Sequence, residues 1–323
     1  MRASIIIPSH NCREFLIQTL ESILRELGPH DEVVIVDDGS SDGTKEKVCP
    51  FLADERFRYF YQDASGGPAS PRNVGALHAR GEYLFFFDSD DLMLPGKVAS
   101  TVAAFERFPQ SALIFTNFGC VDENGEILDM DFLEGYELID KIRSGGEPDV
   151  ALIDAHTACS HLARQNFIGT SGVAIRSSVF SKMGGFDESL KNGDDKDMWF
   201  RITRRYPIVY LDKEYHLYRI RENSISRGGA LKRADARIRV LEKQLRDPVS
   251  KTFAKDIRHQ IALNYHSMAY ELFARGDMRA SREALVQALN HNLQPRFLSL
   301  YLKSLLGRRG VAVIRSLKHR VGM

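Results

Sequence analysis

The chain contains the stretch EYLFFFDSDD at residues 82–91. Its aromatic and aliphatic run predicts a strand that is buried on both faces. Three carboxylates follow within four positions, and carboxylates this close repel one another unless a cation lies between them. Oxygen ligands suit Mg²⁺ or Mn²⁺, and Mg²⁺ is usually held by one or two carboxylates together with the phosphates of a substrate. We therefore expect a metal-diphosphate site here. The alternative is a solvated turn in which Asp91 caps a helix from Pro95.

Strand and helix patterns alternate four times within the first 110 residues around this stretch. The expected strands lie at residues 4–8, 33–36, 57–61, 82–87, 112–118 and 173–176. This alternation predicts an α/β fold with a mostly parallel sheet and helices on both faces. In such sheets ligands bind beyond the carboxyl ends of the strands. Because residues 37–38 and 88–90 follow two of the strands, we expect their acids to lie on one rim.

Two common nucleotide-binding motifs are absent from the sequence. No G-x-G-x-x-G follows either early strand, which disfavours a nicotinamide-dependent dehydrogenase, and no G-x-x-x-x-G-K-[ST] occurs, which argues against a P-loop phosphotransferase. The stretch DDGSSDGT at residues 37–44 also suits a turn that caps a helix. Two adjacent acids at a strand end exceed what a cap requires, so we interpret Asp37 and Asp38 as part of the site.

The segment after residue 120 has fewer clear patterns. Asn124-Gly125 predicts a hairpin turn, and residues 130–165 are expected to form short helices and loops that act as a lid on the acceptor side. His156 and His161 are five positions apart, which is more typical of packing or surface positions than of metal ligands. An acidic stretch at 194–197 begins a helix, for which an N-cap role of Asp194 is the structural alternative to a functional one.

Charge divides the 323-residue chain into two parts. Residues 1–226 carry 24 Lys and Arg against 36 Asp and Glu, a net charge of −12, whereas residues 227–323 carry 20 against 7, a net charge of +13. We therefore expect an α/β domain at 1–226 and a basic helical region at 227–323. The four cysteines form no C-x-x-C pair, and no apolar run suits a signal peptide or a membrane span. A reduced, cytoplasmic protein is the simplest expectation.

Six motifs, taken together and in order, resemble the family 2 glycosyltransferases of the GT-A fold. They are SIIIPSHN at 4–11, VDDGSSDGT at 36–44, RNVG at 72–75, FDSDD at 87–91, GGFD at 184–187 and GDD at 193–195. The resemblance covers roughly residues 3–226. It implies an inverting transfer of a sugar from a nucleotide-diphosphate donor, with a UDP-sugar as the first candidate, to a hydroxyl of a carbohydrate or glycolipid acceptor. Surface polysaccharide or glycoconjugate synthesis is the implied setting.

The resemblance also implies roles for the residues around the donor. Asp37 would accept the N3–H of the base, with Asp38 beside it, and Pro8 and Ser9 would line the nucleoside pocket. The other residues expected at the donor are Asn11, Arg72, Asp88, Ser89, Asp90 and Arg221. Asp90, together with Asp88, would hold a Mg²⁺ or Mn²⁺ ion that bridges the diphosphate and neutralises charge on the leaving nucleotide.

Asp195 matches the catalytic base of the family, which takes the proton of the acceptor as its oxygen attacks the anomeric carbon. The family commonly has Glu-Asp where this chain has Asp194-Asp195, and we place Asp194 on the acceptor side with Trp199. Because Asp195 begins a helix, we expect a lowered pKa and hence a weak base, so that alignment and the metal supply most of the catalysis. Arg221 stands where relatives often carry His. Its guanidinium can bind phosphate, and a solvated loop cation is the alternative.

The basic region has two features. Residues 265–295 resemble one tetratricopeptide-type helical hairpin, and a single unit cannot form a solenoid. Residues 304–323 mix apolar residues with five Lys and Arg, which suits an anionic membrane surface as well as a solvated helix end. Peripheral association with the inner membrane face is therefore an option for a cytoplasmic protein. No aromatic-basic interleaving or reader motif occurs, so a nucleic-acid partner is not expected.

Two other functions are compatible with this fold class. One is a non-catalytic sugar-nucleotide-binding or scaffold protein, against which the complete set of acids argues. The other is a nucleotidyltransferase, which would need a Gly-rich loop bearing Arg or Lys near the N-terminus. Residues 8–11 do not supply such a loop.

Overall fold

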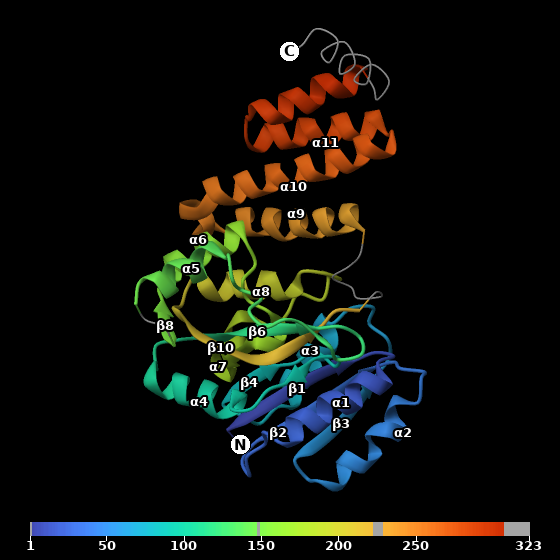
Figure 1. The fold of residues 1–323 in the computed structure, drawn as a ribbon, viewed down its shortest axis with the longest axis vertical. Coiled ribbons are helices and arrows are strands. Elements are labelled where there is room, and N and C mark those ends of the chain that lie inside the picture. The colour runs from blue at the N-terminus through green and yellow to red at the C-terminus, as the bar shows by residue number, and fades with distance from the viewer. Residues whose placement is uncertain (1, 147–148, 222–228, 307–323) are drawn as a thin grey trace. The chain divides into compact units, whose positions relative to one another are not determined.

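The computed structural model describes residues 2–146, 149–221 and 229–306 (Figure 1). The chain divides into two units, residues 1–222 and 223–323. A sheet with the strand order β3-β2-β1-β4-β9-β6-β10-β5 runs through the first unit, while β7 pairs with β6 and β8 pairs with β10. The strands are β1 (Ala3–Ser9), β2 (Glu32–Asp38), β3 (Phe57–Gln62), β4 (Tyr83–Phe86), β5 (Leu92–Met93), β6 (Leu113–Val121), β7 (Ile127–Asp129), β8 (Val150–Ile153), β9 (Val173–Arg176) and β10 (Ile208–Arg219).

Helices lie on both faces of this sheet, as the alternating pattern predicts (Figure 1). In the first unit they are α1 (Arg13–Leu24), α2 (Thr44–Val48), α3 (Ala69–His78), α4 (Lys97–Arg107), α5 (Glu137–Ser144), α6 (Ala155–Arg164), α7 (Ser177–Met183) and α8 (Asp194–Thr203). The segment expected to be a lid of helices and loops thus also contains the strand β8, which pairs antiparallel with β10.

The sheet is parallel in one half and mixed in the other. β3, β2, β1 and β4 pair in parallel, because a helical segment crosses over between each pair of neighbours. β9 then pairs antiparallel with both β4 and β6, and β5, β7 and β8 also pair antiparallel. The α/β class is confirmed, and the parallel arrangement holds where the sequence alternates regularly.

The aromatic run of β4 is buried on both faces, as predicted. Phe85 and Phe87 belong to the core cluster that contains Phe105 of α4. Phe86 points to the other face, where its ring centroid lies 5.2 Å from that of Phe180 in α7. Because side chains of a strand alternate between faces, a strand covered on both sides needs apolar residues at every position.

β1 is the point at which the strand order reverses, with β2 on one side and β4 on the other. The carbonyl oxygen of Ile6 accepts a hydrogen bond from the N–H of Phe87, so alternate residues of β1 face β4. Pro8 is the next residue on that side and has no N–H to donate. Pairing with β4 ends there, while pairing with β2 continues to Ser9 and Asp37. A ligand site is expected where neighbouring strands part in this way.

The second unit is helical. Its elements are α9 (Ala230–Arg246), η4 (Pro248–Phe253), α10 (Ala254–Arg275), α11 (Met278–His291) and a helix at residues 295–306. Small residues such as Ala269 and Ala288 let α10 and α11 pack closely around Leu285 and Phe297. Gly276, at φ +91°, ends α10, and the side chain of Asp277 caps α11. Over the ranges that the structure describes, none of the helices has the length and apolar character needed to cross a membrane.

Candidate active site

Asp37 and Ser9 lie side by side at the carboxyl ends of β2 and β1. The carboxylate of Asp37 is buried and accepts hydrogen bonds from the N–H of Ser40 at 2.8 Å and the hydroxyl of Tyr59 at 2.6 Å. Burial and this carboxylate raise the pKa of Tyr59, so its hydroxyl keeps its proton and remains a donor. The Oγ of Ser9 is buried without a hydrogen-bond partner among the described residues, and buried Pro8 precedes it. An orphaned buried hydroxyl at this rim suits a bound ligand.

The Asp38 carboxylate is used by the protein itself. It accepts hydrogen bonds from the side-chain amide of Gln62 at 2.6 Å and from the N–H and hydroxyl of Ser65, each at 2.9 Å. Asp38 therefore folds the loop between β3 and α3. Asn11, at φ +48°, ties the neighbouring loop, since its N–H donates to Ser40 and its side-chain oxygen accepts from the N–H of Ser41.

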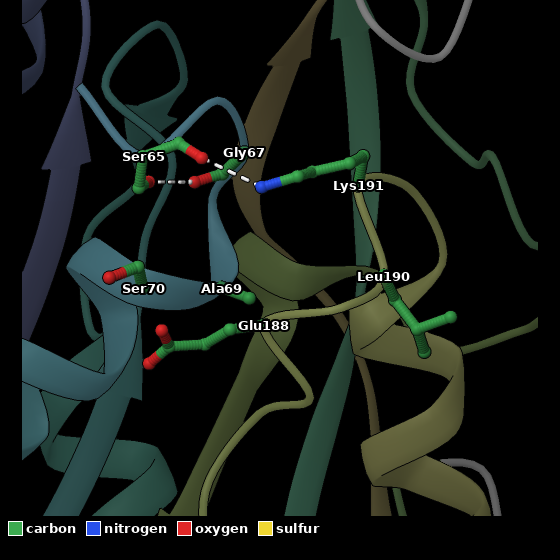
Figure 2. A pocket seen from close by; sticks show the side chains of 7 residues that line it. All are labelled: Ser65, Gly67, Ala69, Ser70, Glu188, Leu190 and Lys191. Carbon is green, nitrogen blue, oxygen red and sulfur yellow. Dashed lines mark hydrogen bonds between the residues drawn. The ribbon is translucent and has the colours of Figure 1, made fainter.

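A pocket with about 240 Å³ of open space lies between this loop and the segment that precedes α8 (Figure 2). Its lining consists of Ser65, Gly67, Ala69, Ser70, Glu188, Leu190 and Lys191. The ammonium group of Lys191 donates to the carbonyl oxygen of Ser65 at 2.7 Å, drawn as a dashed line in Figure 2, and so links the two segments. The predicted acids do not line this pocket. Asp38 is connected to it through Ser65.

Arg72 of α3 joins two motifs that are far apart in the sequence. Its guanidinium donates to the carboxylate of Asp88, after β4, at 2.7 Å and to that of Asp194, in α8, at 2.8 Å. Burial alone would lower the pKa of Arg72, but the two carboxylates raise it, so the guanidinium stays charged. Burial raises the pKa of Asp194 despite this partner. The structure thus brings the end of β4 and the start of α8 together, as the expected site requires.

Asp194 and Asp195 form the first turn of α8, whose N-cap is Gly193 at φ +82°. The alternative N-cap role of Asp194 is therefore wrong. Burial and the charge of Asp194 raise the pKa of Asp195 to about 6. The expected lowering is also wrong, because desolvation and a like charge outweigh the helix N-terminus. A carboxylate with this pKa is still ionised at pH 7 and is a stronger base than an ordinary aspartate.

Trp199 does not lie where the sequence predicted. It is fully buried in the domain core, and its ring meets that of Phe186 edge to face at a centroid distance of 6.1 Å. An aromatic side chain without exposed surface cannot stack on an acceptor, so its place on the acceptor side is wrong. Trp199 is buried because it lies on the apolar face of α8, with Met198 and Ile202.

Asp88 and Asp90 follow β4, and buried Ser89 lies between them. The Oδ2 of Asp90 forms an ion pair with the Nε of Arg221 at 2.7 Å. Burial and the nearby charge of Asp88 raise the pKa of Asp90. The carbonyl oxygen of Ser89 accepts a hydrogen bond from the thiol of Cys12 at 3.6 Å, which ties the loop after β1 to this stretch.

The residues present fit a hard divalent ion that shares its coordination shell with a ligand. Within residues 2–146, 149–221 and 229–306, no group of three or more His, Cys, Asp and Glu side chains is arranged to hold a metal. The charge of Asp88 raises the pKa of Asp90. A divalent ion between them would reduce this repulsion and could take its remaining ligands from a diphosphate. Asp90 and Asp88 are the carboxylates that would hold it.

The sequence analysis did not identify three residues that hold the predicted acids, two at the loop after β4 and one at the end of β2. Arg219 donates from its Nε to the carbonyl oxygen of Asp90 at 2.9 Å, Ser171 accepts from the N–H of Asp88 at 3.0 Å, and Tyr59 donates to Asp37. Arg219 could have been found, because it ends β10 and stands only two positions before Arg221 in the same basic stretch. No local signal marks Ser171, since its partners are distant in the sequence.

Comparisons with known proteins show which family and which folds the chain resembles. Residues 4–163 match the family described as "Glycosyl transferase family 2". An "Uncharacterized glycosyltransferase" of Rickettsia bellii is 28% identical over 222 residues, which are 68% of this chain and 29% of that protein. The "Putative teichuronic acid biosynthesis glycosyltransferase TuaG" of Bacillus subtilis is 35% identical over 127 residues, 39% of this chain and 50% of that protein. The match spans about a third or less of the length of the first relatives.

Solved structures share the fold at 18% identity. TarS 1-349 from S. aureus, in complex with UDP-GlcNAc, gives a TM-score of 0.67 over 93% of this chain and 84% of that chain. The mannosyltransferase PcManGT from Pyrobaculum calidifontis, in complex with GDP-Man and Mn²⁺, gives a TM-score of 0.60 over 98% of this chain and 80% of that chain. At this level of identity the likeness establishes the architecture.

Proposed function

We propose that this chain, whose residues 4–163 belong to glycosyl transferase family 2, transfers a sugar from a nucleotide-diphosphate donor to an acceptor hydroxyl. The observation that carries the proposal is the bridge made by Arg72. It holds the carboxylate of Asp88 and that of Asp194 within hydrogen-bonding distance of one guanidinium. The bridge brings Asp88, a proposed metal ligand, close to the start of the helix that bears Asp195, the proposed base, and this proximity supports the proposal.

The donor is assigned to the rim formed by β2, β1 and β4. Asp37 and the free hydroxyl of Ser9 would bind the nucleoside, and a UDP-sugar is the first candidate because one structural neighbour holds UDP-GlcNAc. Asp90 and Asp88 would hold Mg²⁺ or Mn²⁺. When bound, this ion would offset the negative charge that develops on the leaving diphosphate. The neighbour that contains Mn²⁺ supports the choice of a divalent ion.

Asp195 is the proposed general base. It would accept the proton of the acceptor hydroxyl as that oxygen attacks the anomeric carbon from the face opposite the diphosphate, so the configuration would invert. Its raised pKa suits this role. Arg221, paired with Asp90 in this structure, would reach the diphosphate oxygens once the ion takes over Asp90.

The direct test is a panel of nucleotide sugars, each offered with Mn²⁺ and with EDTA. We expect one donor to stabilise the protein against heating only with Mn²⁺ and to be slowly hydrolysed. A scaffold protein would bind without hydrolysis. A nucleotidyltransferase would instead consume added pyrophosphate and convert the nucleotide sugar into a nucleoside triphosphate and a sugar 1-phosphate. No stabilisation by any donor with Mn²⁺ or Mg²⁺ would contradict the proposal.

We also propose that the acceptor belongs to a surface polysaccharide or glycoconjugate and that the enzyme reaches it at the inner membrane face. The helix at 295–306 buries Phe297 and Leu300 but exposes Leu298, Leu302 and Leu305, which lie on one outer face at helical spacing. Residues 284–323 contain seven Lys and Arg and no Asp or Glu. Exposed leucines within an exclusively basic segment suit an anionic lipid surface. Residues 307–323 lie outside the described part of the chain.

A further inference from the structure

Asp91 is the third acid of the stretch at 88–91, and the proposed reaction gives it no role. Its side chain is only 1% exposed. One carboxylate oxygen accepts a hydrogen bond from the hydroxyl of Ser171, and the other accepts one from the N–H of Arg219 at 2.9 Å. A buried carboxylate with both oxygens in use is poorly placed to become a metal ligand. The expected alternative of a helix cap is also wrong, because α4 begins at Lys97 with Gly96 as its N-cap.

Each of these two donors also holds one of the proposed metal-binding acids. The hydroxyl oxygen of Ser171 accepts a hydrogen bond from the N–H of Asp88 at 3.0 Å. The Nε of Arg219 donates to the carbonyl oxygen of Asp90 at 2.9 Å. The buried Asp91 side chain is thus linked through Ser171 to the backbone N–H of Asp88 and through Arg219 to the backbone carbonyl of Asp90. Its own carbonyl oxygen is fixed by the hydroxyl of Thr19 at 2.8 Å.

A buried cation accompanies this arrangement. Lys97 of α4 is 1% exposed, and its ammonium group lies 6.0 Å from the ring centroid of Phe87. No hydrogen-bond partner for that group is present among the described residues. Burial lowers the pKa of Lys97, while the charge of Asp91 raises it. When Lys97 carries its proton, its attraction to Asp91 offsets part of the cost of enclosing a carboxylate here.

We infer that Asp91 is a positioning residue. Through Ser171 and Arg219 it holds the backbone of Asp88 and Asp90 so that their carboxylates face the metal and the donor diphosphate. The inference rests on the proposed function for the last part of this statement. The hydrogen bonds themselves can be tested without any ligand.

Asp91→Asn and Ser171→Ala remove the links in different ways. In Asp91→Asn an amide N–H₂ replaces the oxygen that accepts from Ser171, so the hydroxyl proton of Ser171 loses its acceptor. Ser171→Ala removes the hydroxyl, whereas Ser171→Thr keeps it and serves as the conservative variant.

Ser4→Ala is a matched control at the opposite end of β1. The hydroxyl of Ser4 makes the same two kinds of bond, because it donates to the carboxylate of Glu32 at 2.7 Å and accepts from the N–H of Gly81 at 2.8 Å. Both serines are buried. We therefore expect Ser4→Ala to reproduce the loss of stability without touching the stretch at residues 88–91.

The first measurement is amide hydrogen exchange of a peptide covering residues 84–93 in the ligand-free protein. We expect exchange at Asp88 to be at least about tenfold faster in Asp91→Asn and Ser171→Ala, as follows from losing a hydrogen bond of ordinary strength. Ser171→Thr and Ser4→Ala should exchange like the wild type there. Unchanged protection in Ser171→Ala would overturn the inference.

The second measurement is the affinity for UDP in the presence of Mn²⁺, well below the unfolding temperature of each variant. We expect about tenfold weaker binding in Asp91→Asn and Ser171→Ala and wild-type binding in Ser171→Thr and Ser4→Ala. Equal loss of thermal stability in Ser4→Ala and Ser171→Ala with unchanged UDP affinity would show a purely structural role and overturn the inference. If the wild type itself fails to bind UDP with Mn²⁺, the proposed donor is wrong, and the exchange experiment still decides whether Asp91 positions the loop.

Discussion

At the scale of single residues, carboxylates that are close in the sequence have very different surroundings. Asp195 lies beside Asp194 and is partly buried, which raises its pKa to about 6. Asp38 accepts three hydrogen bonds from the loop between β3 and α3 and from Gln62. The chemistry that each acid can perform thus follows from its neighbours in space rather than from its motif.

Asp195→Asn should change activity and stability in opposite directions. We expect transfer to be lost, because an amide cannot accept the acceptor's proton. The folded state keeps a proton on Asp195 up to about pH 6, whereas the unfolded chain loses it near the ordinary value of 3.8. The wild type therefore loses stability as pH rises from about 4 to 6, and the Asn variant does not.

The gain in the free energy of unfolding should be about 1–3 kcal/mol at pH 7.5 and should vanish near pH 4. Urea unfolding at both pH values measures it. The transfer rate of the wild type should rise with pH up to about 6 and then level off. Retained turnover in the Asn variant, or equal stability of the two proteins at pH 7.5, would contradict this role of Asp195.

Lys97→Met tests the buried ammonium group. Burial lowers the pKa of Lys97 to about 7, against an ordinary value of 10.5. Between these pH values the unfolded chain binds a proton at Lys97 that the folded protein lacks. The stability of the wild type relative to the variant should therefore rise with pH, on the order of 1.4 kcal/mol per pH unit and a few kcal/mol in all. Urea unfolding from pH 7 to 9.5 measures this slope. Lys141→Met, at an exposed position, is the control, and its stability relative to the wild type should not change with pH. If the stability difference between the wild type and Lys97→Met is also independent of pH, the lowered pKa of Lys97 is refuted.

At the scale of elements, α3 positions the site by its close approach to the sheet. A Cβ atom on Gly75 would lie 2.4 Å from the Cγ2 of Ile6 in β1, so only glycine allows this packing. Arg72 lies one turn earlier on the same helix, with its guanidinium between Asp88 and Asp194. The distance between α3 and β1 therefore sets where the bridge stands.

Gly75→Ala should push α3 away from β1. We expect the free energy of unfolding to fall by about 1–3 kcal/mol, as for other overpacked cores. Donor affinity should fall as well, because Arg72 moves with the helix. Ile6→Ala removes the Cγ2 atom that the new Cβ would meet. In the double variant we therefore expect donor affinity to return toward the wild-type value, while stability recovers less. Calorimetry and donor titration measure the two effects, and independent, additive effects of the two substitutions would contradict the steric explanation.

At the scale of the whole molecule, charge and apolar surface are unevenly distributed. Residues 1–226 carry a net charge of −12 and residues 227–323 one of +13. The leucines at 298, 302 and 305 are each more than half exposed on the helix at 295–306. A basic segment with an apolar face binds anionic bilayers better than neutral ones.

Vesicle sedimentation should detect this property in the full chain. We expect binding to vesicles that contain phosphatidylglycerol, little binding to pure phosphatidylcholine, and weakening by salt. Leu302→Asp with Leu305→Asp, or removal of residues 307–323, should reduce binding while activity on a soluble acceptor persists. Leu77→Asp changes a leucine of the α/β domain that is even more exposed, at 80%, and should have no effect. Equal binding to both kinds of vesicle would refute the electrostatic part of the proposal.

The sequence was sufficient for those features whose cause is local. The strand at 83–86 is visible because burial on both faces demands an unbroken apolar run, and the acids at 37–38 and 88–90 are visible because they follow such runs. The parallel pairing among β3, β2, β1 and β4 follows from the helices that connect successive strands, whereas their order in the sheet was not predicted. These patterns depend on residues within one or two turns of each other.

The folded chain was needed for everything that depends on contacts between distant segments. Arg72 meets Asp194 across 122 positions, and Ser171 meets Asp91 across 80. Trp199 was expected on the acceptor side but is fully buried. The pKa of Asp195 is raised, whereas its position at a helix N-terminus predicts that it is lowered. Burial and electrostatic fields sum over neighbours in space, and a linear pattern does not specify which neighbours those are.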